Sequence, residues 1–153
     1  MQFVANCGII KLLKEKTVII LTTEMMIAAG TENDLEILTT DVIRQLGIPA
    51  HLKGYRYLRY ALILCVENSE MISSVTKLLY PAVAAKFETT SCCVNSSIRQ
   101  AVAIAWNKGN REILSRYLGG NVFTRERKPT NAEFIASVSE TLRLGIKRQN
   151  SRR

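Results

Sequence analysis

The sequence predicts an all-α protein: one domain of six or seven helices that contains a helix-turn-helix, preceded by a short N-terminal extension. Three observations support this fold class. Apolar residues recur at helical spacing from Thr40 onward, Gly and Pro interrupt the pattern where helices would stop, and capping residues stand where helices would start. A chain of 153 residues, 47% hydrophobic and 22% charged, is long enough for a substantial core and is typical of globular proteins.

Residues 1–40 differ in character from the rest, and we expect them to form an extension of unknown role. They are rich in β-branched residues and end in a polar stretch at 30–34. The apolar run at 17–30 superficially resembles a signal peptide. It contains Glu24, however, and a charged group there costs about 2.5–3.5 kcal/mol on insertion into a bilayer. The run is also too short to cross a membrane, so we expect neither a targeting nor a membrane segment.

The domain proper is expected to occupy residues 41–146, followed by a basic, disordered tail at 147–153. Its helices are expected at residues 41–46, 53–67, 69–79, 81–88, 91–108, 111–118 and 131–144. Gly47 and Pro49 stop the first helix, and Tyr55, Leu58 and Leu62 give the second an inward apolar face. The third carries apolar residues throughout, and Pro81 fits the first position of the fourth.

The remaining helices are marked by their ends. Gly109 closes the long helix at 91–108, and Gly119-Gly120 ends the short one at 111–118. Thr130 and Glu133 have the spacing of a capping box, in which each side chain accepts from the other residue's backbone N–H. This box opens the last helix.

The segment 81–100 has the pattern of a helix-turn-helix. Ala84 is small where two helices cross closely, Thr90 is a good N-cap, and a buried stripe follows. The stripe consists of Val94, Ile98, Ala101 and Ala105. The opposite face carries short polar side chains, on the side that a DNA-binding helix turns to the major groove. An ordinary helical hairpin gives the same apolar pattern, so spacing alone leaves DNA binding open.

The charge is distributed unevenly along the chain. Residues 1–88 hold nine Lys/Arg and nine Asp/Glu, whereas residues 89–153 hold twelve and four, which places the whole net charge of +8 in the second part. A basic region that begins at the second helix of the helix-turn-helix suits a polyanionic partner. The alternative is a solvated basic surface together with a frayed basic tail.

The sequence does not favour an enzyme, a metal site or a cofactor. The four cysteines show no C-x-x-C spacing, and His51 is the one histidine, so no zinc ligand set is apparent. Cys65 lies among apolar residues and is expected in the core. One histidine gives little material for Ser/His or Cys/His catalysis, and no Gly-rich phosphate loop is present. The cysteine usage indicates a reducing compartment, and we expect a cytoplasmic protein.

Several motifs resemble one family. They are Leu46–Tyr55 (LGIPAHLKGY), Val75–Pro81 (VTKLLYP), Ala105-Trp106 with Gly109-Asn110, and Lys128–Ala136 (KPTNAEFIA). Together and in this order they resemble the DNA-binding effector domain of the stage-zero sporulation protein A family of response regulators, over about residues 41–144.

This resemblance implies a six-helix effector domain with its helix-turn-helix at about 81–100, and two such domains binding double-stranded DNA in tandem. The region from Gly109 to Phe134 is similar to the family region that touches RNA polymerase sigma subunits. On that basis we expect sigma contacts at Arg125, Arg127 and Lys128. From the residues alone, this segment is interpreted as a solvated loop or a phosphate clamp.

Two departures from the family pattern stand out. About 40 residues precede the effector domain, which leaves no room for the family's receiver domain within this sequence, so we expect no phosphorelay control. The family's recognition helix typically reads Ser-Arg-Val-Glu-Arg, where this chain has Cys92-Cys93-Val94-Asn95-Ser96. Arginine to guanine is the commonest specific base contact, so this change alters the expected sequence preference.

Two classes of function follow. The favoured one is a DNA-binding transcriptional regulator with an altered preference, with α-helix 91–108 in the major groove. The other is an interaction protein or decayed paralogue that modulates a full-length relative or a sigma subunit without specific DNA readout. The expected DNA-binding residues are Lys86, Thr90, Ser91, Cys92, Asn95, Ser96 and Arg99.

Overall fold

The computed structural model describes residues 32–120 and 127–152, and every regular element within them is helical. The all-α prediction is therefore confirmed for this part of the chain. The chain divides into two compact units, residues 1–38 and 39–153, and the second contains the features described below. None of the described helices is long and apolar enough to cross a bilayer.

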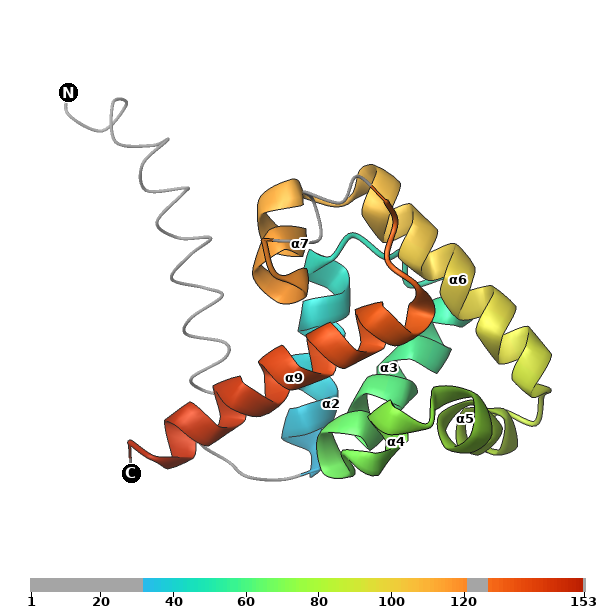
Figure 1. Cartoon of the computed structure of the whole chain (residues 1–153), viewed down its shortest axis with the longest axis horizontal. Coiled ribbons are helices and arrows are strands. Elements are labelled where there is room, and N and C mark those ends of the chain that lie inside the picture. Colours follow the sequence, from blue (N-terminus) through green and yellow to red (C-terminus); the bar gives the residue numbers. More distant parts are fainter. Residues whose placement is uncertain (1–31, 121–126, 153) are drawn as a thin grey trace. The chain divides into compact units, whose positions relative to one another are not determined.

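The second unit is organised around one central helix, α3. The described elements of the chain are α2 (Glu32–Gln45), whose residues from Thr39 onward belong to this unit, α3 (Lys53–Glu67), α4 (Glu70–Ser73), the π-helical segment η1 (Val75–Leu79), α5 (Tyr80–Lys86), α6 (Ser91–Lys108), α7 (Arg111–Leu118) and α9 (Asn131–Asn150). α6 and α9 both pack against α3, and α5 packs against the first part of α6 (Figure 1). The helix-turn-helix is thus held on a scaffold of two long helices.

The core of this unit confirms the predicted inward faces. In α3, Tyr55, Leu58 and Leu62 are buried, and Cys65 is buried beside them. In α6 the predicted stripe is buried along its whole length. Its members are Val94, Ile98, Ala101 and Ala105, each with 0% exposure. Burying a side chain of Leu or Ile size contributes about 1.5–3 kcal/mol, so this stripe anchors α6 firmly.

Gly54 allows α3 and α6 to approach closely. A Cβ atom at this position would collide with the backbone carbonyl oxygen of Ser97 and would lie 3.0 Å from the Cβ of Ala101. A residue without a side chain is therefore needed where α3 crosses the second turn of α6. This contact fixes the position of α6 on the scaffold.

α2 begins at Glu32, whereas the sequence predicted a short helix from Asp41. The helix thus begins within the polar stretch at 30–34, at the end of the expected N-terminal extension. Carboxylates such as that of Asp34 are favoured in a first turn, because they complement the partial positive charge of the helix N-terminus. At the other end the prediction was right: α2 ends at Gln45, and Gly47 follows with φ +81°.

The predicted single helix at 69–79 is wrong. It is divided at Ser74 (φ −136°, ψ 55°) into α4 and the π-helical segment η1. The Leu79 N–H donates to the Ser74 carbonyl at 3.3 Å, a bond that spans five residues and widens the turn. The wider turn buries Val75 and Leu79 together and leaves Leu78 46% exposed.

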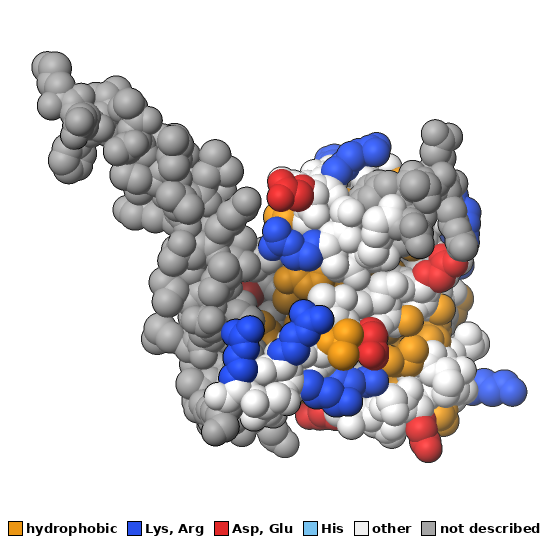
Figure 2. All heavy atoms as spheres, turned by 60° about the vertical axis from the view of Figure 1, so that its left-hand side comes forward, with side chains coloured by type: hydrophobic (Ala, Val, Ile, Leu, Met, Phe, Trp, Pro, Cys, Tyr) orange, Lys and Arg blue, Asp and Glu red, His pale blue; other side chains and the backbone are white. Residues whose placement is uncertain are grey.

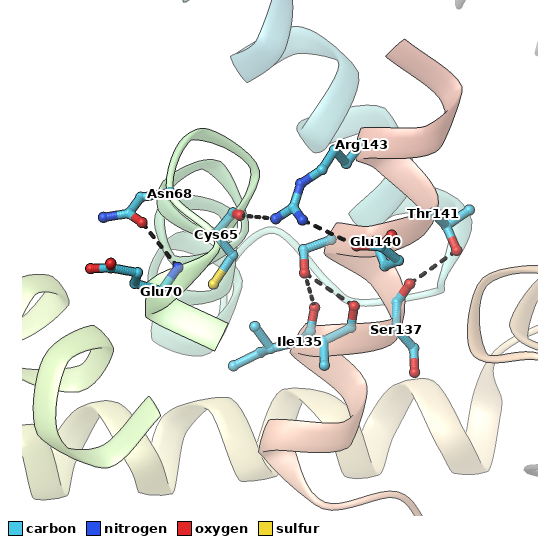
Figure 3. Close-up of polar contacts among 10 residues, drawn as sticks. Cys65, Asn68, Glu70, Ile135, Ser137, Glu140, Thr141 and Arg143 are labelled. Carbon is cyan, nitrogen blue, oxygen red and sulfur yellow. Dashed lines mark hydrogen bonds and ion pairs between the residues drawn. The ribbon is translucent and has the colours of Figure 1, made fainter. Parts of the chain in front are cut away.

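α9 continues to Asn150, beyond the predicted end at Leu144, so most of the expected disordered tail is helical. Lys147 and Arg148 lie in its last turn, where cations interact favourably with the helix dipole. Arg143 also ties α9 to α3, because its guanidinium donates to the Cys65 carbonyl at 2.7 Å and pairs with Glu140 at 3.2 Å (Figure 3). This bond satisfies a carbonyl in the last turn of α3 that has no partner within the helix.

Candidate nucleic-acid interface

The turn between α5 and α6 is built by two capping motifs. The Thr89 N–H donates to the Ala84 carbonyl at 3.0 Å, which is the long bond of a Schellman helix ending, and Glu88 takes the left-handed conformation at φ 52°. The Thr90 hydroxyl then accepts from the Cys93 N–H at 3.2 Å, so the predicted N-cap of α6 is confirmed. Together these bonds fix the angle at which α6 leaves the turn.

The expected reading face of α6 points away from the core. Cys92, Ser96 and Arg99 are exposed, whereas Ser91 and Asn95 are half-buried. Cys93 and Gln100 are also exposed on this helix, and the sequence analysis did not include them among the DNA-binding residues. The exposed surface of the first three turns of α6 therefore consists of small or neutral side chains and one guanidinium.

Asn95 is held by a buried residue of another helix. The side-chain Nδ2 of Asn131, at the start of α9, lies 2.9 Å from Asn95 Oδ1, 3.0 Å from the Asn95 carbonyl and 3.2 Å from the Tyr80 hydroxyl. Asn131 is only 9% exposed. Reading an adenine requires the Oδ1 of an asparagine as an acceptor and its Nδ2 as a donor. In this structure the Oδ1 of Asn95 already accepts from Asn131.

An open hollow of about 630 Å³ lies beside the first turns of α6. Four of the expected DNA-binding residues line it: Ser91, Cys92, Asn95 and Arg99. The segment that precedes and opens α9 lines it as well, and this segment includes Lys128. The structure therefore brings Lys128, an expected sigma contact, next to the expected DNA-binding residues. Lys86, Thr90 and Ser96 are not part of the lining.

Lys86 lies in a separate cluster of cations and aromatic rings at the end of α5. Its ammonium lies 5.8 Å from the centre of the Tyr60 ring, and the Arg56 guanidinium lies 5.3 Å from that of Phe87. Phe87 in turn packs against Tyr57 at 5.1 Å. Arg56 belongs to α3, and nothing in the sequence showed that it adjoins Lys86 at the end of α5.

The cysteines differ in environment. Burial raises the pKa of Cys65 to about 11, and the prediction that it lies in the core is confirmed. Hydrogen bonds with Thr90 and Thr89 lower the pKa of Cys93, and the positive charge of Lys53 acts in the same direction. The N-terminus of α3 therefore contributes positive charge near the first turn of α6. Cys7 lies outside the described residues.

The capping box at the start of α9 is confirmed. Glu133 Oε2 accepts from the Thr130 N–H at 2.8 Å, and the Thr130 hydroxyl accepts from the Glu133 N–H at 3.2 Å. Arg127 pairs with the same carboxylate through two bonds, at 2.8 and 3.3 Å. The Arg127 hydrogen bonds, then that from the Thr130 backbone, lower the pKa of Glu133 to about 2. Arg125 lies outside the described residues.

The basic side chains do not form one uniform patch on the face shown in Figure 2. Lys and Arg side chains there are separated by acidic, polar and hydrophobic ones. Mixed charge of this kind gives weaker long-range attraction to a polyanion than a single-sign field does.

The comparison with protein families agrees with this geometry. The model of the family described as "Sporulation initiation factor Spo0A C terminal" matches residues 39–142. This range covers α3, the helix-turn-helix, the segment around Lys128 and the first turns of α9. The match covers more than half of the chain, and the resemblance inferred from the sequence motifs is confirmed. The chain therefore belongs to the Sporulation initiation factor Spo0A C terminal family, the helical DNA-binding effector domains that regulate transcription at the initiation of sporulation.

Proposed function

We propose that this chain binds double-stranded DNA through α6, with a sequence preference that differs from the usual site of its family. One observation carries this proposal: the exposed face of α6 is anchored on α3 in the manner of a recognition helix, but it presents small side chains around a single guanidinium. The scaffold for groove binding is therefore present, while the groups that discriminate between bases are few.

The expected roles follow from the chemistry of the exposed groups. Arg99 is the one arginine of α6, and a bidentate contact of its guanidinium with guanine contributes about 1–3 kcal/mol of discrimination. Ser91, Cys92 and Ser96 are small enough to let the helix approach the groove closely. Lys86 and the N-terminus of α6 at Thr90 are expected to contact phosphates, which position the helix without reading sequence.

The hydrogen bonding of Asn95 favours a second candidate function. Its Oδ1 is engaged by Asn131, and base-reading arginines of the family pattern are replaced by small groups. A protein with so little direct readout suits the role of an interaction protein or decayed paralogue, which modulates a full-length relative or a sigma subunit. In that case Lys128 and Arg127, rather than α6, face the partner.

The deciding experiment is a titration of the purified chain with three duplexes: the usual operator of the family, a random pool and a scrambled control. Each titration is made at 50 and 200 mM salt, because phosphate contacts make affinity fall steeply with salt. Selective binding to an enriched sequence supports the regulator. Weak binding that is equal on all duplexes supports the second candidate.

Arg99→Ala identifies the helix that is responsible, and Lys108→Ala is its matched control. Both substitutions remove one positive charge from α6, but Lys108 is exposed in the last turn, about 13 Å further along the helix axis. We expect Arg99→Ala to weaken binding about tenfold and Lys108→Ala to have a much smaller effect, since a specific contact contributes more than a distant screened charge. Equal affinities for the two variants would contradict the assignment of α6.

A further inference from the structure

Two cations from separate elements line the hollow beside α6. Arg99 comes from the third turn of α6, and Lys128 from the segment just before α9. Both side chains are exposed, and neither forms an ion pair with a described residue. The neighbour of Lys128 behaves differently, because Arg127 is bound to Glu133 through two hydrogen bonds. Arg127 therefore fixes the segment that precedes α9, while the charge of Lys128 stays available to a ligand.

The rest of the hollow is not a cluster of charges. Its sides are formed by small apolar side chains, namely those of Val75, Pro129 and Ala132. The buried Tyr80 and Asn131 also contribute, and their polar groups bind one another at 3.2 Å. A ligand that fits must carry an anionic group for the two cations and a compact, weakly polar body for the apolar sides. A phosphate ester of deoxyribose has both parts.

We propose that this hollow receives one phosphodiester of the bound DNA strand, with its phosphate between Arg99 and Lys128 and its deoxyribose against Val75 and Pro129. This inference rests on the proposed DNA binding. Four hollow-lining residues of α6 also belong to the expected DNA face, so a strand that lies along α6 passes over the hollow. Lys128 then serves DNA binding directly, and its role does not require a sigma subunit.

A double-mutant cycle on DNA affinity tests whether the two cations share one phosphate. The full chain carries Arg99→Gln, Lys128→Gln or both, and binding to a random duplex is measured by fluorescence anisotropy at 50 mM salt without any sigma subunit. Groups that share a partner show non-additive effects. We expect the double variant to bind at least about threefold more tightly than the product of the two single losses predicts.

The matched control pairs Arg99→Gln with Lys86→Gln. Lys86 is exposed but does not line the hollow, so its effect should multiply with that of Arg99. The salt dependence of DNA affinity is a second measurement of the same contact. Loss of one phosphate contact lowers the slope of log affinity against log salt by about 0.9, which is about 3.5-fold in affinity between 50 and 200 mM. We expect this change for Lys128→Gln.

A third pair of variants tests the hollow itself. Ala132→Glu places a carboxylate at its edge, whereas Ala132→Gln adds a side chain of similar size without charge. Both are tolerated in the first turn of α9, where Ala132 is exposed and acidic residues are favoured. The Glu variant should bind DNA about fivefold more weakly than the Gln variant, the effect of like charges about 4 Å apart in water.

The outcomes separate this inference from the proposed function. Strict additivity of Arg99 and Lys128, with equal affinities for the two Ala132 variants, would overturn the shared phosphate while DNA binding by α6 still stood. If the unaltered chain does not bind any duplex, the proposed function fails and this inference fails with it. Non-additivity together with the Ala132 difference would establish the site.

Discussion

Asn131 connects the start of α9 to the expected reading helix, and its removal should destabilise the fold measurably. Its Nδ2 has three acceptors, the Asn95 carbonyl, Asn95 Oδ1 and the Tyr80 hydroxyl, at 2.9 to 3.2 Å. The group carries two hydrogens, so two good bonds exist at one time. We therefore expect Asn131→Ala to remove two hydrogen bonds from a largely buried position.

The expected magnitude follows from these two bonds. Each net hydrogen bond contributes about 0.5–1.5 kcal/mol, so Asn131→Ala should lower the free energy of unfolding by about 2 kcal/mol. For a folded unit of this size that loss corresponds to about 8 °C in the midpoint of thermal unfolding. Thr130 remains as the N-cap of α9, so loss of the cap does not contribute.

The assay is urea unfolding at pH 7, followed by circular dichroism, with Tyr80→Phe and the double variant as controls. Tyr80→Phe removes one acceptor and should cost about 1 kcal/mol or less. The double variant should be destabilised by less than the sum, since both substitutions remove the same Asn131–Tyr80 bond. A loss below about 0.5 kcal/mol for Asn131→Ala, or full additivity with Tyr80→Phe, would refute this account of the network.

Three further predictions concern other parts of the molecule. Gly54→Ala should destabilise the chain by about 1–3 kcal/mol, because the new Cβ would collide with the Ser97 carbonyl. Gly145→Ala should instead stabilise the chain by about 0.5–1 kcal/mol, because its Cβ meets no atom within 4 Å. Urea unfolding of the two variants measures both effects. The pKa of the Glu133 carboxylate is lowered to about 2, so this group should stabilise the fold above its ordinary pKa of 4.5 and lose this contribution as the pH falls toward 2. The difference in melting temperature between the unaltered chain and Glu133→Gln should therefore shrink between pH 4.5 and pH 2. A difference that stays constant over this range would contradict the prediction. Iodoacetamide should alkylate the exposed Cys93 in the native state, as peptide mass spectrometry can show. Cys65 is buried and its pKa is raised to about 11, so it should react only after unfolding. Rapid labelling of Cys65 in the native state would contradict its burial.

The element boundaries show where sequence patterns reach their limit. The Gly47 stop and the Thr90 cap follow from interactions within a few residues, and both predictions were right. The division at Ser74 and the continuation of α9 past Leu144 were missed. A widened π turn keeps an ordinary helical composition, and Gly145, which follows the predicted end of α9, lies inside the helix and does not stop it.

The sequence by itself determined the fold class, the buried stripe of α6, the capping box of α9 and the family. These features depend on periodicity and on bonds between near neighbours, which are visible in the order of the residues. Only the tertiary structure decided that Asn131 engages Asn95, and that Lys128 lies at the same hollow as Arg99. Periodicity indicates which face of a helix is buried, but the partner of that face depends on how α6 and α9 are set against α3 by close contacts such as that of Gly54.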